Sequence, residues 1–242
     1  MKRVTSILIC ALASAQAQTG GFADECWRRV APVYARTLEH PFLKGMSDGT
    51  LPKEKFRFYM QQDLLYLREF SRLLLELAAR SPRGDWARTL GRHALEAIEE
   101  EAALHGEILG LQRGKGDDAE PGLQMAPANA AYVNHLRSSV LRGGFLEGMA
   151  AVLPCYWIYL EIGRELAKKG SPVSEYQKWI RQYAGEGYEK SVKEALSIFN
   201  AAAAQAGSAE RGRALEAFER SARYEWMFWD MAWRMETWPP GP

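Results

Sequence analysis

From Phe22 onward, apolar residues recur at the spacing of an α-helix, and no stretch of the chain shows the alternating pattern of a β-strand. Because this one periodicity runs through almost the whole sequence, it predicts an all-α fold. Neither a long polar linker nor an internal repeat interrupts it, and 242 residues are enough to bury a substantial core. We therefore expect residues 20–242 to form a single helical bundle.

Proline and glycine divide the pattern into about seven helices. His40-Pro41 ends the first helix, because a residue before proline avoids the α conformation. The turn at Ser47–Thr50 leads to Pro52, which suits the first position of a helix. The glycine- and proline-rich segment 112–127 is typical of a loop. The predicted helices cover about Ala23–Leu38, Lys53–Ala79, Trp86–Leu111, Ala128–Leu141, Gly144–Lys168, Val173–Tyr183 with a continuation to Phe199, and Ala209–Thr237.

Residues 1–19 differ from the rest of the chain. Lys2 and Arg3 precede the mostly apolar run Val4–Leu12, which is followed by the small-x-small spacing that a signal peptidase recognises. The apolar run is far shorter than the roughly 20 residues that span a bilayer. The sequence therefore predicts a cleaved secretory signal and an exported protein without a membrane anchor. An uncleaved extension would leave the protein in the cytoplasm.

Charge and cysteine content exclude several classes of protein. The 31 lysines and arginines nearly balance the 30 aspartates and glutamates, so no excess of positive charge indicates a nucleic-acid partner. The three cysteines are too few and too scattered for a disulfide framework or a four-thiolate zinc site. Any chemistry of a cysteine in this chain is therefore expected to involve one thiol alone.

Cys155 follows Pro154 inside an otherwise helical apolar stretch. A proline within a helix removes one backbone hydrogen bond and costs about 3 kcal/mol, which a chain often tolerates for geometry at a site. Tyr159 lies four residues further along, on the same helical face, where it could orient a molecule that binds at the thiol. Free cysteine is also among the most commonly buried residues, so the same pattern fits an inert packing role.

Asp63 shares one stripe of its predicted helix with Tyr59 and Tyr66. If this stripe faces the core, the carboxylate needs a partner, and a buried carboxylate beside phenols can bind the nitrogens of an amidine-like group. An aspartate that faces solvent is the alternative.

Glu225 stands among large aromatic neighbours in the segment Tyr224–Trp229. Removal of water would disfavour its charged form and raise its pKa, which would make it a proton donor near neutral pH. The alternative is an exposed carboxylate on the polar side of an aromatic helix.

The histidines and Cys155 bear on three kinds of metal or cofactor site. A zinc deaminase needs a second cysteine where Ile158 stands, although His105-Gly106-Glu107 and Pro154-Cys155 supply half of the motif. None of the four histidines has a glutamate three residues before it, so the di-iron Glu-x-x-His motif is absent. His40 could bind haem, although a His-Pro junction more simply marks the end of a helix.

Several separate short segments of the sequence resemble those of one known family and occur in the same order. The chain is similar, from about Phe22 to Trp238, to the TenA-type thiaminase II family of aminopyrimidine aminohydrolases, in its cysteine-bearing branch. The segments are His40-Pro41-Phe42, Asp48–Pro52, Phe58-Tyr59, Gln62-Asp63 with Tyr66-Leu67, Leu153–Trp157, Tyr176–Ile180, and Tyr224-Glu225 with Phe228-Trp229. The resemblance implies the haem-oxygenase-like helical fold. The usual members are cytosolic, so the first residues are a departure.

The resemblance also implies a site and a reaction. Cys155 matches the nucleophile, Glu225 the catalytic acid and Asp63 the carboxylate that holds the aminopyrimidine. The tyrosines that match lining positions are Tyr66, Tyr132, Tyr159 and Tyr183. Glu225 would protonate the ring while Cys155 adds to it, and the group on the exocyclic methylene would then leave. The implied reaction converts 4-amino-5-aminomethyl-2-methylpyrimidine into hydroxymethylpyrimidine and ammonia, with thiamine cleavage as a second activity, in thiamine salvage or degradation.

The implied partners are small molecules, and the implied assembly is a homotetramer. No metal ion and no organic cofactor is implied. A different class of protein fits the same residues: a non-catalytic periplasmic binder of thiamine or pyrimidine fragments, in which Cys155 only lines the site. A haem binder that uses His40 is a further alternative.

Overall fold

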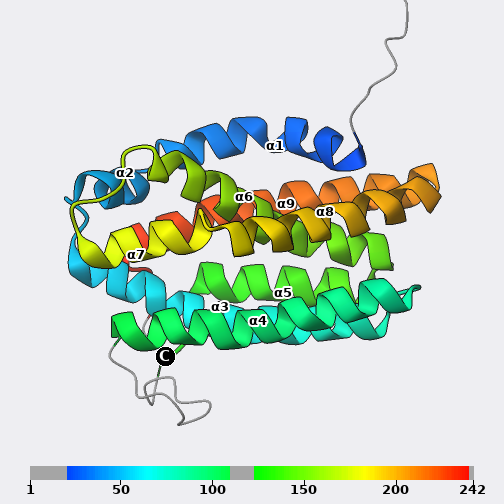
Figure 1. Ribbon diagram of the computed structural model, residues 1–242, viewed down its shortest axis with the longest axis horizontal. Coiled ribbons are helices and arrows are strands. Elements are labelled where there is room, and N and C mark those ends of the chain that lie inside the picture. Colours follow the sequence, from blue (N-terminus) through cyan, green and yellow to red (C-terminus); the bar gives the residue numbers. More distant parts are fainter. Residues whose placement is uncertain (1–20, 110–122, 240–242) are drawn as a thin grey trace, which may run out of the picture.

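The computed structural model describes residues 21–109 and 123–239, without the side chains of residues 100–109. Within these residues the chain forms nine α-helices and no strand, which confirms the predicted all-α class (Figure 1). The helices are α1 Phe22–Leu38, α2 Pro41–Asp48, α3 Lys53–Ala79, α4 Gly84–Leu109, α5 Pro127–Arg142, α6 Phe145–Ala167, α7 Ser174–Tyr183, α8 Glu186–Gln205 and α9 Ser208–Arg234. The predicted secretory signal in residues 1–19 lies outside the described residues.

The structure has nine helices in its described residues where the sequence predicted about seven main ones, for two local reasons. The chain makes an additional short helix, α2, where His40 accepts a hydrogen bond from the Phe42 amide and Pro41 occupies the first turn. Gly49 ends α2 in the left-handed conformation, with φ of 82°. An eight-residue helix is too short for its periodicity to stand out. The helix expected to continue beyond Tyr183 is instead divided into α7 and α8, because Gly185 between them adopts an extended conformation.

Helix α6 is the centre of the bundle. It packs against α5, α7, α8 and α9, while α3 packs along α4 on the other side of α5 (Figure 1). Among the described helices, α6 alone has the length and apolar composition that a membrane span would need, but 78% of its most apolar window is buried within the bundle. Its apolar character is therefore explained by its position in the core. The helix continues through Pro154.

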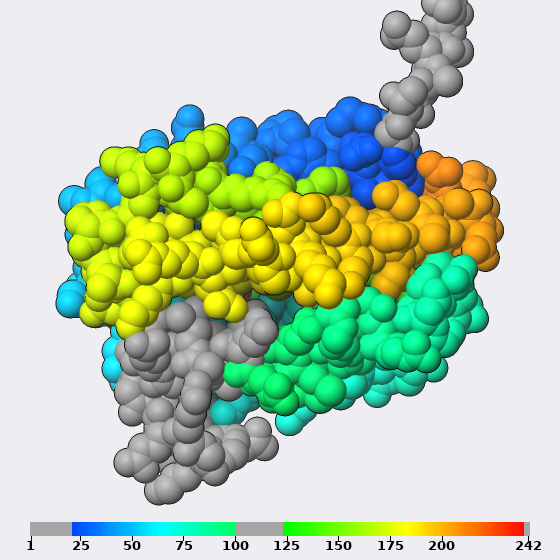
Figure 2. Space-filling model, in the orientation of Figure 1, coloured from blue at the N-terminus to red at the C-terminus, as the bar shows by residue number. Residues whose placement is uncertain are grey.

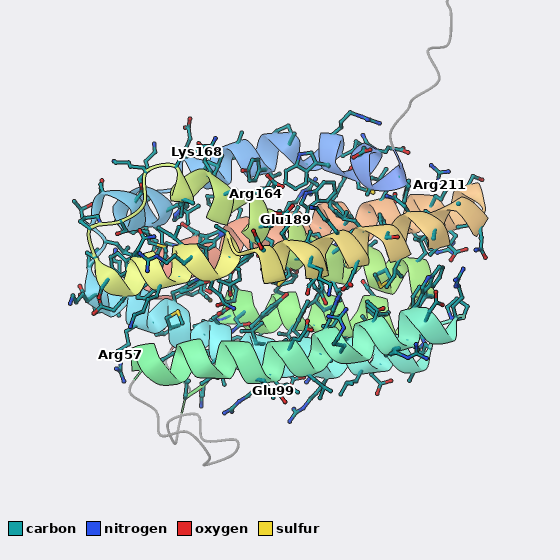
Figure 3. All side chains as sticks on the ribbon, in the orientation of Figure 1. Arg57, Glu99, Arg164, Lys168, Glu189 and Arg211 are labelled. Atoms are coloured by element: carbon teal, nitrogen blue, oxygen red, sulfur yellow. The ribbon has the colours of Figure 1, made fainter. Side chains whose placement is uncertain are left out.

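Charged side chains lie on the outside and join neighbouring helices. In Figure 3, Arg164 of α6 and Glu189 of α8 lie side by side, with 2.8 Å between Nη2 and Oε1. On the face shown in Figure 2, the surface is hollowed between α8 and α4. The same two helices are joined by Glu194 of α8, which accepts a hydrogen bond from Arg92 and contacts His93 of α4 at 3.0 Å.

Gly163 of α6 lies against the last residue of α7, and this close approach predicts a large effect of a single methyl group. A Cβ atom at Gly163 would lie 2.7 Å from the carbonyl carbon of Tyr183 and 2.9 Å from the amide nitrogen of Ala184. We expect Gly163→Ala to lower the free energy of unfolding by about 1–3 kcal/mol, because backbone atoms must move apart. The measurement is urea unfolding followed by circular dichroism.

Gly91 in the middle of α4 provides the matched control. A Cβ atom there would have no neighbour within 4 Å. Gly91→Ala should therefore raise the free energy of unfolding by about 0.5–1 kcal/mol through helix propensity alone. Equal effects of the two substitutions would contradict the proposed close contact between α6 and α7.

Candidate functional site

Glu225 of α9 is a buried carboxyl group that favours its protonated form. Its side chain is 1% exposed, and burial raises its pKa from 4.5 to about 8. The charge of Asp63 also raises this pKa, whereas the hydrogen bond from Tyr132 lowers it. Tyr132 of α5 donates its hydroxyl hydrogen to Oε1 of Glu225 at 2.5 Å. The predicted burial of this carboxyl group is therefore confirmed, and the exposed alternative for Glu225 is wrong.

Cys155 of α6 lies beside the tyrosines that surround Glu225. Burial raises the pKa of the Tyr66 hydroxyl well above its ordinary value, and Cys155, Tyr132 and Glu225 raise it further. Burial likewise raises the pKa of Tyr132, with Glu225 and Cys155 acting in the same direction. The thiol and the carboxyl group therefore share the same two neighbouring phenols. Both phenols therefore keep their hydrogens at neutral pH.

Asp63 and Tyr66 lie on the same face of α3, as the predicted stripe requires. Asp63 is 3% exposed, so the solvent-facing alternative is wrong. Its charge contributes to the raised pKa values of Glu225 and of Tyr159 on α6. The Tyr66 hydroxyl is buried and has no hydrogen-bond partner among the described residues. A buried donor of this kind is a natural contact for a bound molecule or a water.

Tyr159 and Tyr183 complete the predicted set. Their ring centroids are 5.0 Å apart, and Trp179 packs against Tyr183 at 4.5 Å. The structure therefore brings all seven predicted residues, which come from α3, α5, α6, α7 and α9, into one buried cluster. We call this set the thiol–carboxyl cluster: Asp63, Tyr66, Tyr132, Cys155, Tyr159, Tyr183 and Glu225. The individual roles assigned to its members stay predictions.

The other described cysteine is unlike Cys155. Cys26 of α1 is fully buried, and burial, followed by the charge of Glu25, raises the pKa of its thiol to about 12. No disulfide joins Cys26 to Cys155. Cys26 is therefore a packing residue without a reactive thiolate.

His40 has a structural position. Its Nδ1 accepts from the Phe42 amide, and its Nε2 lies 3.6 Å from a carboxylate oxygen of Asp230. Both ring nitrogens therefore face protein groups, and the geometry favours the helix-end interpretation over a haem ligand. Among the described side chains, no three histidine, cysteine, aspartate or glutamate residues are grouped so that they could hold a metal ion.

With this geometry established, comparison with known proteins identifies the family. Residues 27–235 match the model of the TENA/THI-4/PQQC family. The chain belongs to the TENA/THI-4/PQQC family. This match covers nearly the whole of the described structure and confirms the resemblance found in the sequence.

Relatives of this TENA/THI-4/PQQC protein support the assignment. A protein named aminopyrimidine aminohydrolase from Bacillus subtilis (strain 168) is 35% identical over 219 residues, which are 90% of this chain and 92% of that protein. The solved TenA homologue from P. horikoshii OT3 superposes with a TM-score of 0.78 at 27% identity, over 89% of this chain and 99% of that one.

A more distant structure shows the fold alone. A domain with a haem-oxygenase-like fold from Shewanella denitrificans superposes with a TM-score of 0.66 at 15% identity, over 88% of this chain and 92% of that one. The predicted haem-oxygenase-like architecture of this TENA/THI-4/PQQC protein is therefore confirmed.

Two supporting contacts in this TENA/THI-4/PQQC protein were missed by sequence reasoning. Tyr188 of α8 donates its hydroxyl hydrogen to the backbone carbonyl of Cys155 at 3.2 Å. Gln62, next to Asp63, accepts from the Ala126 amide at 2.8 Å and donates to the Gln124 carbonyl at 3.0 Å. Both contacts join segments that are far apart in the sequence. The only sequence signal for either of them was the position of Gln62 next to Asp63, in a segment that resembles the family.

Proposed function

We propose that the protein is a hydrolase that cleaves the exocyclic C–N bond of aminopyrimidines. The proposed reaction converts 4-amino-5-aminomethyl-2-methylpyrimidine and water into the hydroxymethylpyrimidine and ammonia, with thiamine cleavage as a second activity. The observation that carries the proposal is the pairing of a protonated acid, Glu225, with the Cys155 thiol through the same two phenols. The similarity to the protein named aminopyrimidine aminohydrolase supports the choice of substrate.

The first step joins the sulfur to the ring. Glu225 gives its proton to a ring nitrogen, and the ring carbon beside that nitrogen becomes electron-poor. The thiolate of Cys155 adds to this carbon, forming a C–S bond while an electron pair of the ring moves onto the nitrogen. Asp63 accepts hydrogen bonds from the amidine-like edge and holds the ring in place.

The second step replaces the amine by water. The electron pair held by the ring nitrogens moves towards the exocyclic methylene, and the protonated amine departs as ammonia. Water adds to the methylene carbon and gives up one proton. The proton lost by the water balances the proton that the departing amine took up. The ring nitrogen returns its proton to Glu225 as the C–S bond breaks, so the ring becomes aromatic again and both the acid and the thiolate are regenerated. Atoms and charge balance to the hydrolysis of one C–N bond, and thiamine follows the same course with thiazole as the leaving group.

We expect the Tyr66 hydroxyl to activate the thiol by donating a hydrogen bond to it. An ordinary thiol has a pKa near about 8.5 and is mostly protonated at pH 7, so the site must stabilise the thiolate. Tyr66 and Tyr132 keep their hydrogens because burial raises the pKa of both hydroxyls. Tyr132 gives its hydrogen to Glu225, so Tyr66 is the phenol that can donate to the sulfur or to the substrate, and neither phenol removes a proton.

Mass spectrometry of the reaction products tests the proposed function. Purified protein incubated with 4-amino-5-aminomethyl-2-methylpyrimidine should release one ammonia for each hydroxymethylpyrimidine formed. Thiamine in place of this substrate should release thiazole. A protein that binds the aminomethyl compound and releases no ammonia would be the non-catalytic carrier instead. Export of the protein and its assembly as a homotetramer stay predictions.

A further inference from the structure

Three side chains from three helices form a chain of hydrogen bonds that ends at the thiol–carboxyl cluster. The indole Nε1 of Trp179, on α7, donates to the hydroxyl oxygen of Tyr59, on α3, at 3.2 Å. The Tyr59 hydroxyl in turn donates to the hydroxyl oxygen of Tyr159, on α6, at 3.2 Å. We call this chain the Trp–Tyr–Tyr relay. Only its last member was among the predicted site residues.

Packing holds the middle of the relay in place. Tyr59 and Trp179 are both fully buried. The Tyr59 ring stacks on Trp229, with centroids 4.9 Å apart and planes at 9°, and Phe228 meets it edge-on at 5.8 Å. A ring enclosed in this way cannot swing its hydroxyl away from Tyr159.

The first member of the relay restricts the direction in which Tyr59 can donate its hydrogen. An indole N–H can donate a hydrogen bond but cannot accept one, whereas a phenol can do either. Because the indole cannot accept, the Tyr59 hydrogen cannot go to Trp179, and it is donated to the Tyr159 oxygen. The hydrogen of Tyr159 is then left for a third acceptor.

The hydroxyl of Tyr159 lies against the face of α3 that carries Asp63, because it contacts Tyr59, which is one helical turn before Asp63. Burial raises the pKa of this hydroxyl well above its ordinary value, and the neighbouring Tyr59, Glu225 and Asp63 raise it further. Tyr159 therefore keeps its hydrogen at any pH at which the enzyme would work. An acceptor bound between Tyr159 and Asp63 would meet this hydrogen.

We infer that Trp179 and Tyr59 are positioning residues that set substrate specificity: they make Tyr159 a fixed donor, and the pair of Tyr159 and Asp63 reads the amino edge of the pyrimidine. This inference rests on the proposed function. The amino edge presents an N–H donor beside a ring-nitrogen acceptor. Asp63 accepts from the amine, and Tyr159 donates to the ring nitrogen.

The same pair rejects a 4-oxo pyrimidine. Its edge is reversed, with a carbonyl acceptor in place of the amine and a ring N–H donor in place of the bare nitrogen. The carboxylate of Asp63 would then face a carbonyl oxygen, and the Tyr159 hydrogen would face another hydrogen. Leaving buried polar groups unpaired in this way costs a large factor in affinity.

Calorimetric titration with two pyrimidines tests the inference without relying on turnover. The probes are 4-amino-5-hydroxymethyl-2-methylpyrimidine and its 4-oxo counterpart. We expect wild-type protein to prefer the amino compound by about 100-fold or more. Tyr59→Phe lets the Tyr159 hydroxyl rotate and accept, so the preference should fall to about tenfold. Trp179→Phe removes only the donor that fixes the direction and should lower the preference to an intermediate value.

Tyr176→Phe is the matched control. Tyr176 is another buried tyrosine, and its hydroxyl donates to the Leu51 carbonyl at 2.8 Å, away from the thiol–carboxyl cluster. Its removal should leave the preference between the two pyrimidines unchanged. An unchanged preference in a folded Tyr59→Phe protein, with both affinities lowered equally, would overturn the inference and leave the proposed function standing. Wild-type protein that binds neither pyrimidine would overturn both.

Discussion

Replacing Cys155 with serine is expected to leave the bundle folded and to lower kcat for 4-amino-5-aminomethyl-2-methylpyrimidine by a factor on the order of 10³ or more. Serine is nearly the same size as cysteine, so the packing around α6 should survive. Its hydroxyl, however, is scarcely ionised near neutral pH and would not add to the ring. Steady-state kinetics and a thermal melt of the same sample measure the two effects.

Cys26→Ala is the control for this experiment, because Cys26 lies in α1 and is fully buried. It should keep wild-type turnover even if its thermal stability falls. Intact-mass spectrometry of a stopped reaction should detect a pyrimidine adduct on wild-type and Cys26→Ala protein, and none on Cys155→Ser. Wild-type turnover by Cys155→Ser would rule out covalent catalysis by this thiol.

Glu225→Gln should lower kcat by about 10²–10⁴-fold and change KM only a few-fold. The amide has the shape of the neutral acid and can still accept the hydrogen bond from Tyr132, but it has no proton to give. Steady-state kinetics would show the split between kcat and KM. Glu216→Gln, an exposed carboxylate on the same helix, is the control and should behave as wild type. Unchanged kcat in Glu225→Gln would remove Glu225 from the acid role.

The pH dependence follows from the pKa of Glu225, which is about 8 in the folded protein and 4.5 ordinarily. Turnover should fall as pH rises through about 8, because the acid loses its proton. Between about pH 4.5 and 8 the folded state holds a proton that the unfolded state has lost, so stability should fall as pH rises. Thermal melts across this range should show a weaker decline in Glu225→Gln, which has no proton at this position to lose.

The general architecture and much of the candidate site could be predicted from the sequence because both depend on local patterns. Helical periodicity placed Asp63 and Tyr66 on one face of α3, and the aromatic surroundings of Glu225 indicated a carboxyl group removed from water. Periodicity alone did not decide which face of α3 or α9 lies in the core. That choice depends on the neighbouring helices, and only the assembled bundle shows it.

Other parts could not be predicted, for different physical reasons. The short helix α2 depends on a cap by His40 and on a left-handed glycine, not on a repeated apolar pattern. The contacts of Gln62 with residues 124–129 and of Tyr188 with the Cys155 carbonyl join segments far apart in the chain. The direction of the relay follows from the placement of Trp179 against Tyr59, which no spacing within one helix reveals.

The origin of the thiol–carboxyl cluster in five helices has a consequence for how the protein would lose activity. No fragment of the chain carries the set: Asp63 lies near the beginning of the described bundle, and Glu225 lies near its end. The reacting groups come together in space only when the entire hydrophobic core has assembled. Catalysis and helicity should therefore disappear together in a single cooperative transition on heating, with no partly melted species that still turns over substrate.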